Sequence, residues 1–118
     1  MPELPEVETV VRWLAPKVKG KTISRFISYY ERSLCGESQN SLTKLLKGKK
    51  VKAVKRRAKY IVIELSSGAL ALHLRMTGRL IVGKPDSKDQ KHIIAKFEFS
   101  DGSELNFKDV RKFATIEC

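Results

Sequence analysis

Residues 92–110 read HIIAKFEFSDGSELNFKDV and contain two strand-like runs joined by an Asp-Gly pair. Apolar and polar side chains alternate on both sides of this pair, which is typical of a half-buried β-hairpin. A Ser-Gly pair at 67–68 separates two further runs of the same kind, YIVIEL and ALALHL. The sequence therefore predicts antiparallel strands joined by tight turns.

Two segments have helical patterns instead. Apolar residues before position 19 recur at helical spacing: Val7, Val10, Val11, Leu14 and Val18. Pro5 suits a first helical turn and Gly20 is a natural stop, so we expect a helix from about Pro5 to Lys19. Pro16 is expected to kink or shorten its last turn. The segment SQNSLTKLLKG at 38–48 predicts a second, short capped helix.

The chain of 118 residues shows no internal repeat and no linker, so we expect a single domain over residues 1–118. The predicted fold is mainly β, a two-layer antiparallel β-sandwich with an N-terminal α-helix and a second short helix. The polar segment GKPDSKDQK at 83–91 is predicted to be a mobile loop.

The charge balance favours a polyanionic partner. Lysine and arginine number 24 against 13 acids, a net charge of +11. Nucleic acid is the first candidate and an anionic membrane surface the second, while solubility alone remains an alternative reading of net charge. With 42% apolar residues, a folded core is expected rather than wholesale disorder.

The cysteines and the hydropathy narrow the class of protein further. Cys35 and Cys118 lie far apart without a CxxC spacing, which argues against a zinc site and gives no disulfide framework. The sequence has neither a long apolar run nor a signal-peptide pattern. We therefore expect a soluble intracellular protein without a membrane partner.

The positive charge is concentrated in one block. No acid occurs between Glu37 and Glu64, a stretch that carries nine basic residues: Lys44, Lys47, Lys49, Lys50, Lys52, Lys55, Arg56, Arg57 and Lys59. A phosphate-binding face is the favoured interpretation. The alternative is a solvated edge strand, since lysines at sheet edges block unwanted pairing.

Four motifs stand out in this context: PELPEVET at 2–9, RRAKY at 56–60, HLRMTG at 73–78 and DVRKF at 109–113. In this order and spacing, the chain resembles the N-terminal domain of formamidopyrimidine-DNA glycosylase, a bacterial base-excision enzyme, from residue 1 to about residue 117. The resemblance implies a DNA N-glycosylase and abasic-site lyase. Its expected partner is double-stranded DNA with an oxidised purine, such as 8-oxoguanine or a formamidopyrimidine, or an abasic site. A cytoplasmic, nucleoid-associated monomer is expected.

The resemblance also implies a catalytic set made of Pro2, Glu3 and Lys59. Removal of the initiator methionine gives Pro2 a free secondary amine, which attacks C1′ of the damaged nucleotide and forms an iminium. Glu3 handles protons beside the sugar, and Glu6 supports the pocket of the flipped base. Elimination then cuts the strand on both sides of the sugar.

The remaining implied roles concern DNA binding. Lys59 and His73 contact phosphates that flank the lesion, and His92 also binds DNA. Arg111 contacts phosphate and probes the base opposite the lesion. Met76, Arg111 and Phe113 fill the gap that the flipped nucleotide leaves in the stack.

Taken singly, most of these residues have a structural reading as well. Glu3 and Glu6 are favourable at a helix N-terminus, Lys59 could be a solvated lysine, and His73 stands at the end of a strand. Met76 could fill a gap in the core, and Phe113 could be a core aromatic residue. The four motifs together favour the functional reading.

The family's enzymes are more than twice as long as this chain, and their other half carries a helix–two-turns–helix and a zinc finger. We therefore expect no metal or cofactor in this chain and weak or absent activity. The alternatives are a non-catalytic DNA-binding module and an inert fragment. With Met1 retained, no lyase activity is expected, because the Pro2 nitrogen is then an amide. Inside the match, Ala114 stands where the family usually has glycine, and Ile94 where many members have a second histidine.

Overall fold

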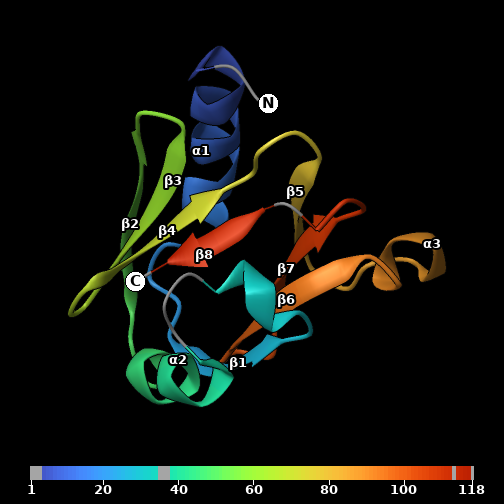
Figure 1. Ribbon diagram of the computed structural model, residues 1–118. Helices are drawn as coiled ribbons and strands as arrows, with labels where there is room; N and C mark the ends of the chain where they lie inside the picture. Colours follow the sequence, from blue (N-terminus) through green and yellow to red (C-terminus); the bar gives the residue numbers. More distant parts are fainter. Residues whose placement is uncertain (1–3, 35–37, 113, 118) are drawn as a thin grey trace.

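A computed structural model describes residues 4–34, 38–112 and 114–117. It contains two four-stranded antiparallel sheets flanked by helices (Figure 1). The predicted fold class is confirmed: the chain is mainly β, with an N-terminal helix and a second short helix.

The hairpin at 92–110 forms the centre of the first sheet. Its strands are β6 (Ile93–Phe99) and β7 (Glu104–Asp109), joined through Gly102 at φ +88°. Strand β1 (Ile23–Ser28) pairs with β6, and β5 (Gly78–Val82) pairs with β7, so the order is β1-β6-β7-β5. Hydrogen bonds from the hydroxyl and N–H of Ser103 to Asp101, with Lys21 nearby, lower the pKa of that carboxyl to about 2.

The second sheet contains β2 (Val51–Arg57), β3 (Tyr60–Leu65), β4 (Ala69–His73) and β8 (Thr115–Glu117), in that order. Strand β2 lies at one edge and β8 at the other. Between β2 and β3, residues 58 and 59 form a two-residue turn, because Arg57 pairs with Tyr60. The pairings are antiparallel throughout the sheet.

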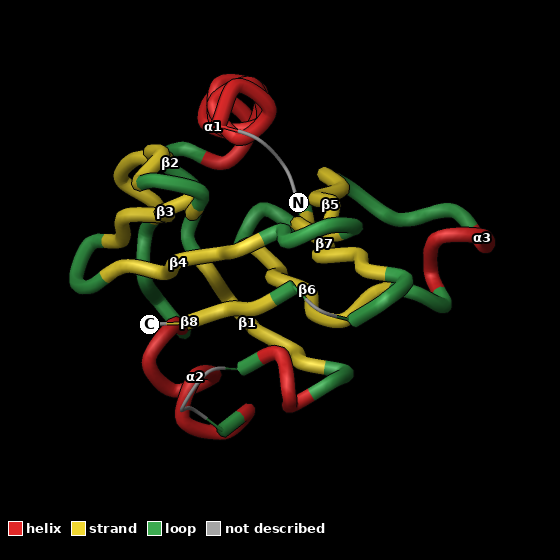
Figure 2. Tube along the Cα trace, turned by 45° about the horizontal axis from the view of Figure 1, so that its top comes forward, coloured by secondary structure: helices red, strands yellow, loops and turns green. Residues whose placement is uncertain are grey.

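The core lies between the two sheets, which face each other (Figure 2). Alternation along each strand turns one set of side chains inward. The largest fully buried ones come from both sheets: Phe26, Phe97, Phe107, Ile61, Leu70 and Leu72. Phe26 and Phe97 contact each other across the β1–β6 pair, with ring centroids 5.0 Å apart.

Helix α1 (Leu4–Val18) covers β2 and β3. Val7, Val11, Leu14 and Val18 are buried, as the spacing predicts, whereas Val10 is only half-buried. Pro16 does not end the helix: the chain remains helical to Val18, and the Lys19 N–H donates to Ala15 at 3.0 Å. This is possible because a proline in the last turn removes only one intrahelical hydrogen bond.

Helix α2 (Gln39–Leu46) confirms the second predicted helix. The Ser38 side chain caps it by accepting the Ser41 N–H at 3.1 Å. Its Thr43 hydroxyl donates to the Phe26 carbonyl at 3.1 Å, which fastens α2 to β1.

Two short elements were not predicted from the sequence. They are the 3-10 helix η1 (Glu31–Ser33) and the helical turn α3 (Ser87–Gln90). Helix α3 lies inside the segment expected to be a mobile loop; Asp86 caps it, and Lys108 of β7 forms an ion pair with its Asp89. None of the helices in the described ranges has the length and apolar character that crossing a membrane requires.

Candidate active site and nucleic-acid interface

Lys59, Met76 and Arg111 lie in three separate loops: the β2–β3 turn, the β4–β5 turn and the loop between β7 and β8. The first two lie beside the N-terminal end of α1, at the top of Figure 1. Each of the three loops holds one residue in the left-handed region, Ala58 at φ +52°, Arg75 at +56° and Lys112 at +59°. Among the described residues, these are the only non-glycines with positive φ. Such strained backbone concentrates at functional sites.

His73 connects the first two loops. It pairs with Tyr60 across β3 and β4, and the two rings meet edge to face with centroids 4.8 Å apart. The side chain is only 6% exposed, and its Nδ1 accepts the Arg75 N–H at 3.0 Å. A neutral imidazole with Nδ1 as an acceptor carries its proton on Nε2.

The surroundings keep His73 neutral. Burial is the largest cause of its lowered pKa, followed by the positive charges of Arg75 and Lys59, while Glu117 acts in the opposite direction. Two positive charges from the adjacent turns, Arg75 and Lys59, therefore act on His73. A neutral N–H donor in a positive field suits contact with an anion.

Met76 and Arg111 come together although they belong to different loops. Met76 is 58% exposed, and Nη1 of Arg111 lies 3.9 Å from its sulfur. Gly78 makes the turn before β5 possible, because a Cβ there would lie 2.4 Å from the Leu74 carbonyl oxygen. The structure thus brings two of the three predicted gap-filling side chains into contact.

Asp109 lies underneath this pair and was not singled out in the sequence. It has no exposed surface, and its carboxylate accepts hydrogen bonds from the Thr77 hydroxyl, the Arg111 N–H at 3.0 Å and the Ala114 N–H at 2.8 Å. Its backbone N–H donates to the His92 carbonyl at 3.0 Å. A signal was present: aspartate often accepts the N–H two residues further on, which marks a turn after a strand.

A groove of about 680 Å³ runs between α1 and the β4–β5 turn. Its lining includes Glu6, Val10, Trp13, Met76, Thr77 and Val110. Trp13, the only tryptophan, is 41% exposed and has the Lys17 ammonium 5.3 Å from its ring centroid. The groove therefore joins Glu6, predicted to support the base pocket, to Met76, predicted to fill the gap.

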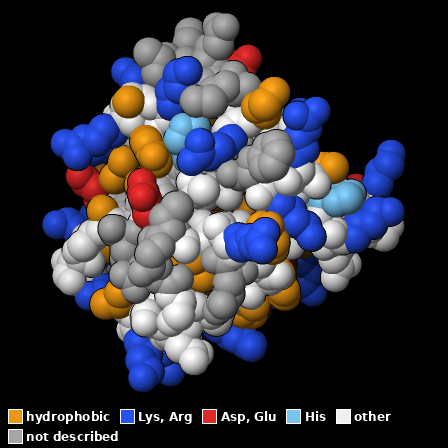
Figure 3. All heavy atoms as spheres, viewed as in Figure 1, with side chains coloured by type: hydrophobic (Ala, Val, Ile, Leu, Met, Phe, Trp, Pro, Cys, Tyr) orange, Lys and Arg blue, Asp and Glu red, His pale blue; other side chains and the backbone are white. Residues whose placement is uncertain are grey.

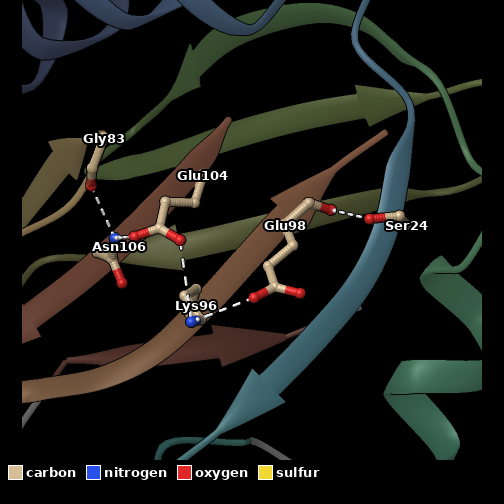
Figure 4. Close-up of polar contacts among 6 residues, drawn as sticks. All are labelled: Ser24, Gly83, Lys96, Glu98, Glu104 and Asn106. Carbon is tan, nitrogen blue, oxygen red and sulfur yellow. Dashed lines mark hydrogen bonds and ion pairs between the residues drawn. The ribbon is translucent and has the colours of Figure 1, made fainter. Parts of the chain in front are cut away.

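A second hollow of about 540 Å³ lies on the outer face of β6 and β7. Figure 4 shows the polar contacts of three residues that line it, Lys96, Glu104 and Asn106. Lys96 lies 3.2 Å from Glu98 and 3.8 Å from Glu104, and Asn106 donates to the Gly83 carbonyl at 2.9 Å. Burial opposes the charge of Lys96, but its hydrogen bond to Glu98 and the nearby carboxylates raise its pKa. Since these charged groups pair with one another, this hollow has the character of a structural ion-pair network.

The basic block does not form one continuous face. Strand β2 spans about 20 Å along its length, and it separates Lys59 at the β2–β3 turn from Lys49, whose ammonium bonds Ser67 at 2.6 Å near the β3–β4 turn. Lys55 pairs with Glu64 and Arg56 with Glu8. Figure 3 shows lysine and arginine side chains dispersed over one face and several of its edges. At the β2–β3 turn, the charge of Lys59 from this block acts on His73.

Three predicted residues, Pro2, Glu3 and Phe113, lie outside the described residues. Glu6 and Arg111 are exposed, Lys59 and His92 are half-buried. Ala114 is buried without a positive φ, so its backbone does not require the glycine that the resemblance leads one to expect. Within the described ranges, no group of three or more His, Cys, Asp or Glu side chains is arranged to hold a metal ion.

Comparison with known proteins agrees with this geometry. The family model for the formamidopyrimidine-DNA glycosylase N-terminal domain matches residues 1–116. A formamidopyrimidine-DNA glycosylase of Carboxydothermus hydrogenoformans is 46% identical over 96% of this chain and 43% of its own length. One from Bacillus cereus is 41% identical over 98% of this chain and 42% of its own. The chain thus spans less than half the length of these relatives.

Solved structures give the same result. The Lactococcus lactis Fpg in complex with DNA containing an abasic site has a TM-score of 0.89 and 36% identity, covering 98% of this chain and 43% of that one. The same enzyme with DNA containing N7-benzyl-Fapy-dG has a TM-score of 0.89 and 37% identity. On the match of sequence, fold and motifs, this chain belongs to the formamidopyrimidine-DNA glycosylase family and corresponds to its N-terminal domain.

Proposed function

We propose that this domain recognises an oxidised purine or an abasic site in double-stranded DNA and provides the nucleophile of a base-excision reaction. The observation that carries the proposal is the contact between Met76 and Arg111, in which the Arg111 Nη1 lies 3.9 Å from the Met76 sulfur. Met76 also lines the groove that Glu6 lines. A flipped nucleotide leaves a gap that inserted side chains must fill. An exposed methionine and an exposed arginine in contact are suited to that role.

The proposed chemistry begins at the Pro2 amine. An α-amino group has a pKa of about 7.7–8.0, so a useful fraction is neutral near pH 7. The nitrogen lone pair forms a bond to C1′, and the C1′–N bond to the base breaks with its electron pair leaving on the base, which takes up a proton. The amine proton is lost, the C1′–O4′ bond opens to give the iminium, and Glu3 supplies the proton to O4′.

The iminium then acts as an electron sink for strand cleavage. Loss of a proton from C2′ allows the 3′ phosphate to leave, and a second elimination releases the 5′ phosphate. Each step conserves electrons without a redox partner. Lys59 and His73 are proposed to hold the flanking phosphates, since an ammonium and a neutral N–H donor both favour phosphate oxygens.

Borohydride trapping on an abasic-site duplex tests the proposal. A protein with a free Pro2 amine should form a stable adduct, because borohydride reduces the iminium to an amine. The matched control is a duplex with a tetrahydrofuran residue, which has no aldehyde at C1′ and should give no adduct. Peptide mapping should place the added mass on the N-terminal peptide. Selective binding of the abasic duplex without an adduct would instead assign the domain to lesion binding without cutting.

A further inference from the structure

We propose that Asp109 is the positioning residue that holds Met76 and Arg111 in the geometry needed to enter the DNA stack, an inference that rests on the proposed function. Its Oδ1 accepts both the Thr77 hydroxyl and the Arg111 N–H, while its Oδ2 accepts the Ala114 N–H. Thr77 follows Met76 directly in the chain. The Asp109 carboxylate is therefore bonded to the neighbour of Met76 and to the backbone of Arg111 itself.

The arrangement requires a carboxylate. An ionised aspartate is an acceptor at both oxygens, and here three donors converge on it. A fully buried charge is costly unless such bonds satisfy it. Asparagine has the same shape but presents an NH₂ group on one side, which would face an N–H donor from the backbone. Asp109→Asn thus removes one acceptor without changing the volume.

These bonds act on the loops more than on the sheet. Asp109 is the last residue of β7, and its partner in the ladder is Gly78 of β5. After β7, the N–H groups of Arg111 and Ala114 donate to the Asp109 carboxylate. The N–H of Lys112 donates to the Asp109 backbone carbonyl at 3.3 Å. The Asp109 N–H also reaches the carbonyl of His92. One buried residue thus joins the segments that carry Met76, His92 and Arg111.

Four variants separate positioning from general stability. Thr77→Val removes the hydroxyl donor, and Thr77→Ser restores it. Asp109→Asn removes one acceptor. Thr43→Val is the matched control, because Thr43 also donates a part-buried hydroxyl bond, to Phe26, but does so in α2. Thermal unfolding identifies the variants that remain folded at the assay temperature, and the Thr77 pair keeps the test decisive if Asp109→Asn does not fold.

The first readout needs no DNA. Amide hydrogen exchange at Arg111 and Ala114 should be about tenfold faster in Thr77→Val than in the wild type. Thr77→Ser and Thr43→Val should leave these rates within about twofold of the wild type. Unchanged exchange at both amides in folded Thr77→Val would overturn the proposal.

The second readout reports insertion into DNA. 2-Aminopurine placed opposite an abasic site should brighten when wild-type protein enters the stack, by several-fold at saturation. Thr77→Val and Asp109→Asn should lose at least half of this response while their affinity for undamaged duplex stays within about twofold. A full response from folded Thr77→Val would also overturn the proposal. A third result is that Thr77→Val shows the exchange effect but the wild type gives no rise in 2-aminopurine fluorescence. That result would contradict both the proposed function and the role of Asp109 in DNA insertion, although Asp109 would still connect the two loops.

Discussion

The guanidinium of Arg111 lies 3.9 Å from the sulfur of Met76, across 35 positions of sequence. Both side chains are exposed. The contact joins a flexible, polarizable side chain to a planar cation, and both can lie against base faces. The two side chains proposed to fill the gap are thus in contact within the domain itself, and a pair already in place loses less conformational entropy on binding.

Replacing either member of this pair should weaken lesion recognition specifically. We expect Met76→Ala and Arg111→Ala each to lower affinity for an abasic-site duplex by about tenfold, equivalent to about 1.4 kcal/mol, with a smaller effect of Met76→Ala on undamaged duplex. Fluorescence anisotropy with both duplexes measures the ratio. Leu45→Ala is the control, because Leu45 is also an exposed apolar side chain, 48% exposed, but lies on α2 away from the groove. Equal losses in all three variants would argue against a specific pair.

The two ends of the basic block should differ in their effect on DNA binding. Lys59 lies in the turn beside His73, whereas Lys44 lies on α2, at the opposite end of the molecule in Figure 1. We expect Lys59→Ala to reduce the slope of log affinity against log salt by about one, the effect of one lost phosphate contact. Lys44→Ala should change the slope less. A larger change from Lys44→Ala would move the DNA path to the α2 end.

His73 should make folding stability depend on pH in the mildly acidic range. Its pKa is lowered in the folded protein, so below about pH 6.5 the unfolded chain binds more protons at this site than the folded one. Stability should therefore fall as the pH drops from 6.5 through the lowered folded pKa, by at most about 1.4 kcal/mol per pH unit.

Urea unfolding of the wild type and His73→Gln across about pH 5–8 measures this contribution. The unfolding free energy of the wild type minus that of His73→Gln should be constant above about pH 7.5, where the histidine is neutral in both the folded and the unfolded chain. This difference should decrease as the pH falls, because only the wild type loses stability through His73. A difference that stays constant down to pH 5 would show that His73 titrates alike in the folded and unfolded chains.

Local patterns were sufficient to predict the strands and the two longer helices of this fold, but not η1 or α3. The Asp-Gly pair at 101–102 joins β6 and β7, and Val7, Val11 and Leu14 form the buried stripe of α1. These features depend on neighbours within a few positions, so sequence spacing records them directly. The motifs likewise placed Met76 and Arg111 in one site, because the resemblance implies the same role for both residues.

Contacts between distant segments were not predictable in the same way. The order β1-β6-β7-β5 is not sequential, and the basic block is divided because β2 carries it from one end of the molecule to the other. Asp109 was overlooked because its role depends on Thr77, 32 positions earlier, and on burial. The motifs indicate DNA contacts for Met76 and Arg111, whereas the hydrogen bonds that connect Asp109 to their loops are evident only in the fold.

The Pro2 amine provides the sharpest test of mechanism for this chain. Three forms should be compared on one abasic-site duplex: one that retains Met1, one with Met1 removed, and the trimmed form with Pro2→Gly. In the first, the Pro2 nitrogen is a tertiary amide without an available lone pair, so no cleavage is expected. The trimmed form should cleave slowly, because positioning of the sugar within about 3–3.5 Å of the amine also depends on phosphate contacts. Pro2→Gly retains a primary amine and should give only a trace.

The comparison has two outcomes that would contradict this account. Fast cleavage by the form with Met1 would exclude the N-terminal amine as the nucleophile. Cleavage by the trimmed form at the rate of a relative of full length would show that residues 1–118 supply all the phosphate contacts the reaction needs. Undamaged duplex run in parallel should remain intact in all three cases, since the iminium cannot form without a reactive C1′.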